Sequence, residues 1–370
     1  MNNSAMSREN TSLFQENSSL FQENSSLFQE NSSLFREKRR SAWLALGLLL
    51  LSVGAMGIGA SVGSTGWESV WHMQQDPVAW QIVWDIRLPR TLGAWLAGAL
   101  LGLAGAVAQG LFRNPLADPY LLGSASGASL GGAVAMVLGG STAMGMEWMQ
   151  RLGMTGMAFV GAGIAVLLAL MLAQGVQNSL RLLLAGVVVG VVLSAMRDML
   201  ELRYPDILQP MKAFGLGSTA FIGWQSCGLM LGALLVCLLA AWGLARVLDG
   251  LSLGESTAAS LGLPLAPMRA GLIVVMALAT GTAVAQAGLI AFVGLAAPHL
   301  VRSMVSAGQA RSCLLSSLMG GVLLLLADIL ARWVMAPEEL PVGVLTALLG
   351  GSYLLWLMHR GHAARQGRGT

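Results

Sequence analysis

The sequence predicts an all-α, polytopic membrane protein with about ten transmembrane helices. Of its 370 residues, 55% are hydrophobic and only 11% are charged, and the mean hydropathy is +0.68. Apolar runs of about 20 residues recur along the chain, and each could cross roughly 30 Å of hydrocarbon as an α-helix. A transmembrane β-barrel would instead need segments of about ten residues with alternating polarity. The composition therefore excludes both a water-soluble domain and a barrel.

Three regions of the chain differ in composition. Residues 1–40 form a low-complexity tail in which the heptapeptide SLFQENS repeats from residue 12 onwards. Its Ser, Asn and Gln content predicts disorder, although the Leu and Phe of each heptad could also form a narrow apolar stripe for a membrane or a partner. Residues 41–360 form the transmembrane domain, and residues 361–370 form a short basic tail. The first apolar run is too long for a signal peptide and predicts an uncleaved first span.

Ten apolar runs define the predicted spans. They cover residues 43–62, 91–112, 120–140, 152–174, 181–198, 224–245, 268–287, 289–306, 313–334 and 341–359. An even number places both termini on one side, and the basic clusters near the two ends make that side cytoplasmic under the positive-inside rule. This topology leaves seven of the 21 basic residues outside: Arg87, Arg90, Arg151, Arg197, Arg203, Lys212 and Arg332. The charge bias supports the topology, and the outer arginines need a separate explanation.

Small residues recur four positions apart within several predicted spans. The pairs include Gly98 with Gly102, Gly127 with Gly131, and Gly186 with Gly190. This spacing lets helix backbones approach closely in lipid, where van der Waals packing replaces the hydrophobic driving force. It predicts a tightly packed bundle and says nothing of function.

No motif in the sequence predicts enzymatic chemistry on this chain. The only lysines are Lys38 and Lys212, and neither stands in the glycine-rich pattern of a Walker A loop. Residues 127–131 match a nucleophile elbow in letters only, because they lie inside a predicted helix. The three cysteines and four histidines lack metal-ligand spacing. We therefore predict no enzyme activity, no metal, no cofactor and no nucleic-acid partner for this chain.

Seven segments of the sequence carry a family resemblance. They are, in order, RLPRTL, NPLADPYLLG, RLLLAGV, LGESTAASLGLPL, GLIAFVGLAAPHLVR, LLLADILAR and ELPVGVLTALLG. They resemble the signature segments of FecCD-type permeases, which belong to the ABC importers of iron-siderophores, haem and vitamin B12. The resemblance covers about residues 41–360. It implies a type II ABC importer permease bundle, a cytoplasmic ABC ATPase that holds ATP and Mg²⁺, a periplasmic substrate-binding protein, and a second permease copy or close homologue.

Three arginines lie at predicted outer helix ends. Arg87 and Arg90 precede the second span and Arg332 ends the ninth. They could snorkel to the interface or pair with nearby acids, such as Asp85 or, one turn before Arg332, Asp328. The resemblance implies instead that they are docking points for glutamates of the binding protein. Bidentate guanidinium–carboxylate geometry suits that task.

The loop between the sixth and seventh spans contains a predicted short helix. Residues 256–260 favour a short helix and are bracketed by glycines, although a plain connecting loop is the alternative. The resemblance implies that this is a coupling helix, formed by Leu253, Gly254, Glu255, Ser256, Ser260, Leu261 and Gly262.

The segment Asn-Pro-Leu-Ala-Asp-Pro, residues 114–119, breaks the chain between the second and third spans, because proline cannot continue a helix. A simple tight turn would explain it. The resemblance implies that Asn114 and Leu116, with Ser179 and Leu180, form a cytoplasmic gate. The role of His299, beside Pro298, stays open.

The predicted function is that of a permease subunit that imports a ferric siderophore across the bacterial inner membrane. Haem and vitamin B12 remain alternative cargoes. An ion-coupled secondary transporter would need a carboxylate near mid-membrane, and the only candidate, Asp328, has Arg332 one turn away. A structural scaffold, which would need no polar path, is the third possibility.

Overall fold

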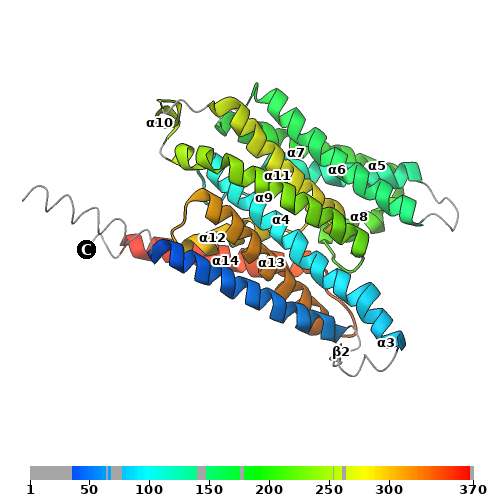
Figure 1. The fold of residues 1–370 in the computed structure, drawn as a ribbon. Coiled ribbons are helices and arrows are strands. Elements are labelled where there is room, and N and C mark those ends of the chain that lie inside the picture. Colours follow the sequence, from blue (N-terminus) through cyan, green and yellow to red (C-terminus); the bar gives the residue numbers. More distant parts are fainter. Residues whose placement is uncertain are drawn as a thin grey trace, which may run out of the picture.

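The computed structural model describes residues 36–63, 66–67, 77–139, 147–175, 179–252, 254–260 and 264–366. The predicted all-α fold is confirmed (Figure 1). Seven helices of the described part are long and apolar enough to cross a membrane. They are Arg36–Ser61, Pro77–Phe112, Gly153–Leu172 within α6 (Glu147–Leu172), Leu180–Arg203 within α7 (Ser179–Arg203), α9 (Trp224–Ser252), α11 (Leu265–Ala287) and α13 (Gln309–Val334).

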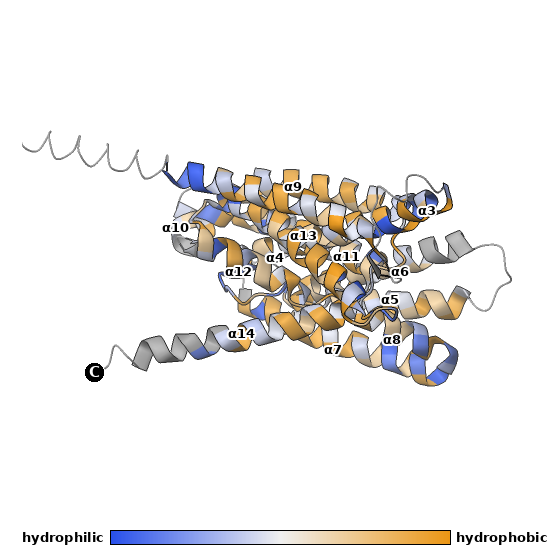
Figure 2. Cartoon of the chain, turned by 90° about the horizontal axis from the view of Figure 1, so that it is seen from below, coloured by the Kyte–Doolittle hydropathy of each residue, from blue (hydrophilic) through white to orange (hydrophobic). Residues whose placement is uncertain are grey.

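The other three predicted spans do not meet this criterion. Ser124–Gly139, which is α5, and Val342–Trp356, within α14 (Val342–Gln366), are shorter apolar helices, and the third span contains α12 (Val293–Met304). The remaining elements are the two-residue strands β1 (Val62–Gly63) and β2 (Gly66–Trp67), the 3-10 helices η2 (Pro119–Leu122) and η3 (Pro205–Ile207), and the helices α8 (Leu208–Leu216) and α10 (Glu255–Ser260). Apolar residues fill the middle of the helices and polar residues gather toward their ends (Figure 2).

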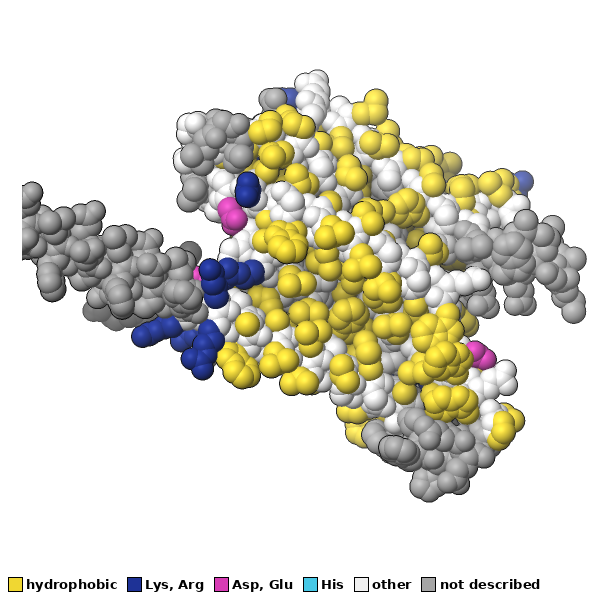
Figure 3. Space-filling view, in the orientation of Figure 1, with side chains coloured by type: hydrophobic (Ala, Val, Ile, Leu, Met, Phe, Trp, Pro, Cys, Tyr) yellow, Lys and Arg dark blue, Asp and Glu magenta, His cyan; other side chains and the backbone are white. Residues whose placement is uncertain are grey.

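The repeats of the low-complexity tail lie outside the described residues. The first helix begins at Arg36, so residues 36–40 belong to it and extend it before the apolar run. Their exposed basic side chains stand at one end of the molecule, where dark blue atoms gather in Figure 3.

The second span begins much earlier than predicted. The helix is continuous from Pro77 to Phe112 and consists of α3 (Pro77–Ile82), the π-helical segment η1 (Val83–Arg87) and α4 (Leu88–Phe112). The placement of Arg87 and Arg90 at a helix end is therefore wrong. Pro89 has no N–H to donate, and the wider turn of η1 lies directly before it, so the helix passes the proline without ending.

The eighth predicted span, residues 289–306, is also different. Only α12 is helical, and its 12 residues are about 18 Å long, too short to cross the hydrocarbon. Gly288 and Phe292 have positive φ values of 71° and 69°. Helix α11 ends just before Gly288, and α12 begins only after Phe292. The buried backbone between them is bonded, since Leu289 N–H donates to the Phe214 carbonyl at 3.1 Å and Tyr120 O–H donates to the Ile290 carbonyl at 3.1 Å. Irregular backbone is tolerated at such depth only when protein satisfies it in this way.

Helix α4 lies at the centre of the bundle. It packs against α9, α11, α12 and α13, with α5 to α7 on one side in Figure 1 and the first helix and α14 on the other. The close packing predicted from the small residues is confirmed at Gly98 and Gly102, where an added Cβ would overlap backbone carbonyls of α13.

The closest approach is at Gly105, and it gives the first prediction. A Cβ at Gly105 would overlap the carbonyl group of Gly294 in α12. We expect Gly105→Val to lower the free energy of unfolding by about 1–3 kcal/mol. The atoms that the new side chain would overlap belong to the backbone of Gly294, which cannot rotate away. The measurement is the yield of monodisperse protein and its melting temperature in detergent. The control is Gly54→Val on the first helix, where an added Cβ meets nothing within 4 Å; equal losses in both variants would contradict the packing argument.

Candidate functional site

A buried group of charges lies where the first helix, α4 and α13 meet. We call it the Asp328 cluster: Arg90, Thr219, Asp328, Arg332 and Glu339. Asp328 is fully buried, and its Oδ1 accepts hydrogen bonds from Arg90 Nε and Nη2, both at 3.3 Å, and from the Thr219 hydroxyl. Its Oδ2 accepts from Arg332 Nε at 3.0 Å and from Arg332 Nη2. The predicted pair of Asp328 and Arg332 is thus confirmed, within a larger cluster.

Arg332 lies in the last turn of α13, as predicted, but its side chain does not face outward. The residue is 1% exposed. Beyond Asp328, Nη1 donates to the Gly59 carbonyl at 2.9 Å and the Val62 carbonyl at 3.4 Å, and Nη2 donates to Thr91 Oγ1 at 3.1 Å. A guanidinium has five N–H donors, and all five have acceptors within the chain. Its geometry therefore suits a positioning role better than a direct contact with a partner.

Arg87 and Arg90 are also more buried than exposed docking residues would be, at 9% and 8%. Arg87 Nη1 lies 3.5 Å from the Ser61 carbonyl oxygen. Arg90, unlike Arg332, also donates to a second carboxylate, because its Nη1 lies 2.7 Å from Oε2 of Glu339, whose side chain is 29% exposed. Of the two salt bridges of Arg90, only the one to Glu339 has a carboxylate at the surface.

The cluster has a chemical consequence for Asp328. Its carboxylate already accepts five hydrogen bonds from two arginines and a hydroxyl, so it has no lone pair left for a coupling ion. Two arginines and two carboxylates also balance in charge, which is the condition for stable burial. The arrangement favours a structural role for Asp328 and argues against ion coupling there.

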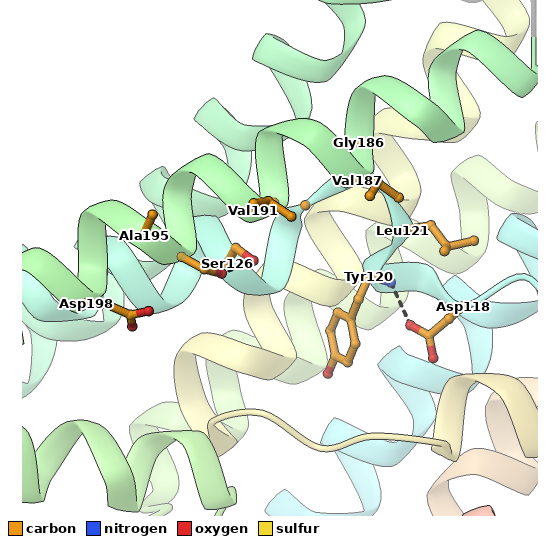
Figure 4. Close-up of a pocket in the computed structure, with 12 residues that line it drawn as sticks. Asp118, Tyr120, Leu121, Ser126, Gly186, Val187, Val191, Ala195 and Asp198 are labelled. Atoms are coloured by element: carbon orange, nitrogen blue, oxygen red, sulfur yellow. Dashed lines mark hydrogen bonds between the residues drawn. The ribbon is translucent and has the colours of Figure 1, made fainter.

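An open pocket of about 670 Å³ lies along α7 (Figure 4). Its wall combines the small or apolar side of α7 with residues of η2 and α5. The polar lining residues are Asp118, Tyr120, Ser126, Ser194 and Asp198. Ser194 Oγ donates to Ser126 Oγ at 3.0 Å and joins α7 to α5. The pocket is therefore a mostly apolar recess with a few fixed polar groups, as in sites for organic ligands.

Two of the predicted gate residues, Asn114 and Leu116, lie in the connection between α4 and η2, shortly before the pocket residue Asp118. Arg113 ends α4 with a φ of 50°, and Asn114 Oδ1 accepts from Leu116 N–H at 2.9 Å, forming a tight turn. Leu116 is 51% exposed and Leu180, in the first turn of α7, is 67% exposed. The side chain of Ser179 lies outside the described residues. Asp118, which lines the pocket, lies two residues after Leu116. The tight turn therefore leads directly into the pocket wall.

Asp118 caps η2, because its Oδ1 accepts from Tyr120 N–H at 2.8 Å. Burial raises the pKa of this carboxyl above its usual value, and the hydrogen bond from the Tyr120 backbone opposes that rise.

The predicted short helix in the loop between α9 and α11 is confirmed as α10. Gly254 precedes it with a φ of 111°, and its carbonyl accepts from Ala258 N–H at 3.0 Å. Ser260 is exposed and its hydroxyl donates to the Thr257 carbonyl at 2.8 Å. Leu253, Leu261 and Gly262 lie outside the described residues, as do the side chains of Glu255 and Ser256. In Figure 1, α10 stands at the end of the molecule where the first helix begins.

Several polar contacts were not predicted from the sequence. Thr219 and Glu339 join the Asp328 cluster from loops, and Asp249, near the end of α9, accepts from Gln309 N–H at 3.0 Å at the start of α13. The only feature of the sequence that drew attention to Glu339 was its place in the segment ELPVG, two residues before Pro341. His299, whose role was left open, makes an edge contact with Tyr353, with ring centroids 5.8 Å apart. Within the described residues, no group of three His, Cys, Asp or Glu side chains could hold a metal ion.

Comparison with known proteins agrees with this architecture. The model of the FecCD transport family matches residues 44–360. Among curated proteins, the chain is 37% identical to the hemin transport system permease HmuU of Yersinia pestis, over 88% of this chain and 96% of that protein. It is 36% identical to the iron(3+)-hydroxamate import permease FhuB of Bacillus subtilis, over 86% and 83%. It is 40% identical to the vitamin B12 import permease BtuC of Salmonella typhimurium, over 75% and 83%.

Solved structures show the same fold. An inward-facing transporter assigned to the metal-chelate ABC type matches with a TM-score of 0.77 and 30% identity, over 86% of this chain and 99% of that chain. PsaBC from Streptococcus pneumoniae matches with a TM-score of 0.51 and 21% identity, over 71% and 88%, and this likeness concerns the fold alone. The family model covers most of the chain and the relatives exceed 30% identity, so this multi-pass membrane protein belongs to the FecCD transport family.

Proposed function

We propose that this chain is the membrane-spanning subunit of an ATP-driven importer that moves a ferric siderophore across the bacterial inner membrane. The observation that carries the proposal is the open pocket along α7, a mostly apolar recess suited to an organic chelate. The relatives are named for hemin, iron(3+)-hydroxamate and vitamin B12. Haem and vitamin B12 are therefore the alternative cargoes.

The energy source in this proposal is a cytoplasmic ABC ATPase that binds ATP and Mg²⁺. An ion-coupled mechanism is disfavoured because the carboxylate of Asp328 is saturated by Arg90, Arg332 and Thr219. Helix α10, with the residues beside it, is the proposed ATPase contact. Helix α10 and the basic start of the first helix lie at the same end of the molecule, and α14 ends there too (Figure 1), which supports a cytoplasmic location for all three.

The outer partner is proposed to be a periplasmic substrate-binding protein. Arg87 and Arg90 would receive its carboxylates, while Arg332 would hold Asp328 and the ends of the first helix in place. A second permease copy is proposed to cover the open side of the pocket, where Val187, Val188, Val191 and Val192 are each more than 50% exposed. Apolar exposure of this extent on one helix is typical of an interface or a lipid contact.

Uptake into proteoliposomes tests the function directly. The permease is reconstituted with its ATPase and its binding protein, and radiolabelled ferric hydroxamate is supplied outside. We expect uptake that requires ATP, stops with vanadate and persists when the proton gradient is collapsed. Uptake that continues without ATP but disappears with the proton gradient would refute the proposal, and competition by excess haemin or cyanocobalamin would reassign the cargo.

A matched pair of variants assigns the path within the same assay. Val191→Trp fills part of the pocket, whereas Val236→Trp adds the same bulk to an exposed position of α9 that does not line the pocket. We expect the uptake rate to fall at least about tenfold for Val191→Trp, with the assembled complex intact by size-exclusion chromatography. Equal rates for the two variants would remove the pocket from the path.

A further inference from the structure

The salt bridge between Arg90 and Glu339 joins a nearly buried cation to an accessible anion. Arg90 Nη1 donates to Glu339 Oε2 at 2.7 Å, and the side chains are 10% and 29% exposed. The two residues are 249 positions apart in the sequence, and Glu339 lies in the segment between α13 and α14 rather than in a helix. A loop carboxylate thus reaches over the edge of the bundle to bind this arginine.

Arg90 has two carboxylate partners that differ in how easily they can leave. Asp328 is fully buried, is held by two further residues, and binds the Nε and Nη2 edge of Arg90. Glu339 binds only Nη1, and no other described residue is seen to hold its carboxylate. Solvent screens an exposed ion pair and reduces its net strength, whereas a buried one is hard to break. Glu339 is therefore the exchangeable counterion of Arg90.

The charge balance of the cluster requires some carboxylate in the place of Glu339. Asp328 alone faces both Arg90 and Arg332, so losing Glu339 would leave one nearly buried positive charge uncompensated. The site at Nη1 consequently favours an anion, and the Glu339 carboxylate occupies it. A second carboxylate can enter only when Glu339 leaves.

We propose that Arg90 Nη1 is a carboxylate-exchange site, in which Glu339 occupies the position that an acidic side chain of the periplasmic binding protein takes on docking. This inference rests on the proposed docking role of Arg90. Glu339 then competes with the partner, so that the free permease keeps a neutral cluster and docking is weaker than the arginine alone would make it.

Chemical rescue with acetate tests the exchange without any partner protein. Glu339→Ala leaves Nη1 without its carboxylate and leaves space beside it. We expect sodium acetate, compared with sodium chloride at equal ionic strength, to raise the melting temperature of Glu339→Ala by a few degrees. The wild-type permease and the control Glu338→Ala, at the neighbouring exposed acid, should not respond. The response should vanish in Glu339→Ala combined with Arg90→Gln.

Binding of the periplasmic protein to the reconstituted permease tests the competition. We expect Glu339→Gln, which keeps the shape of the side chain, to lower the Kd of the binding protein several-fold relative to Glu338→Gln. Arg90→Gln should raise the Kd if the docking role is correct. A higher Kd for Arg90→Gln with no tightening by Glu339→Gln would overturn the inference and leave the docking proposal standing.

Other outcomes are equally decisive. If neither Arg90→Gln nor Glu339→Gln changes the Kd, both the inference and the docking proposal fall. Tightening by Glu339→Gln without any effect of Arg90→Gln, or the absence of acetate rescue in Glu339→Ala, would show that Glu339 does not act through Arg90 and would overturn the inference.

Discussion

Asp328→Ala is expected to abolish stable folding of the permease. The substitution would leave Arg332, which is 1% exposed, and Arg90, which is 8% exposed, facing each other without their shared carboxylate. Removing one partner of a buried ion pair costs about 3–5 kcal/mol, and here two arginines lose the same partner. The measurement is the melting temperature and monodisperse yield in detergent, which should fall well below those of the wild type.

A double variant that lacks both charges of the Asp328–Arg332 pair shows whether Asp328→Ala is unstable because of uncompensated charge or because of lost packing. Asp328→Leu combined with Arg332→Met removes a negative and a positive charge together and leaves Arg90 with Glu339. We expect this double variant to be more stable than Asp328→Ala, because well-packed apolar residues often replace a buried ion pair at little cost. If Asp328→Ala folds as well as the wild type, the cluster does not hold the first helix, α4 and α13 together.

Gly254→Val is expected to uncouple ATP hydrolysis from transport while leaving the bundle folded. Gly254 has a φ of 111°, a conformation that residues with a Cβ rarely adopt, and an added Cβ would have only Thr257 Oγ1 near it, at 3.9 Å. The cost is therefore conformational, about 1–3 kcal/mol, and falls on the position of α10. Since 1 kcal/mol corresponds to about fivefold and 3 kcal/mol to more than about a hundredfold in an equilibrium, we expect ATP-driven uptake to fall at least about fivefold.

The matched control for this variant is Gly243→Val in α9. Gly243 is exposed, has no positive φ, and an added Cβ there meets nothing within 4 Å. We expect both variants to keep the melting temperature of the wild type and only Gly254→Val to lose uptake and substrate-stimulated ATPase activity. Full uptake by Gly254→Val would remove the positioning of α10 from the coupling mechanism.

The sequence predicted the helices much better than their ends. Each of the ten predicted spans contains a helix, because the requirement for internally bonded backbone in lipid turns an apolar run into a helix almost independently of its neighbours. The error at the second span arose because the apolar run begins after Arg90, whereas the helix extends back through Pro89 and the charged residues to Pro77. The error at the eighth arose from residues 288–292, whose buried turn depends on acceptors such as the Phe214 carbonyl, distant in the sequence.

One predicted contact, between Asp328 and Arg332, is confirmed, whereas the rest of the Asp328 cluster was not predicted. The pairing of Asp328 with Arg332 follows from helical spacing, and the structure contains it. The partners Arg90 and Glu339 could not be deduced, since they lie 238 residues from Asp328 and 249 residues from Arg90 respectively. The docking, coupling and gate residues remain predictions that the proposed experiments test.

The amino-acid sequence by itself determined the class of this protein, its spans, its family motifs and the presence of arginines that insertion does not explain. These properties depend on local composition and on order along the chain, which lipid and helix geometry convert directly into structure. Only the tertiary structure decided which arginines are buried, which carboxylate each one binds, and that Glu339 alone among those carboxylates lies at the surface. The free energy of a buried charge depends on partners that packing brings together from distant segments, and no local pattern records them.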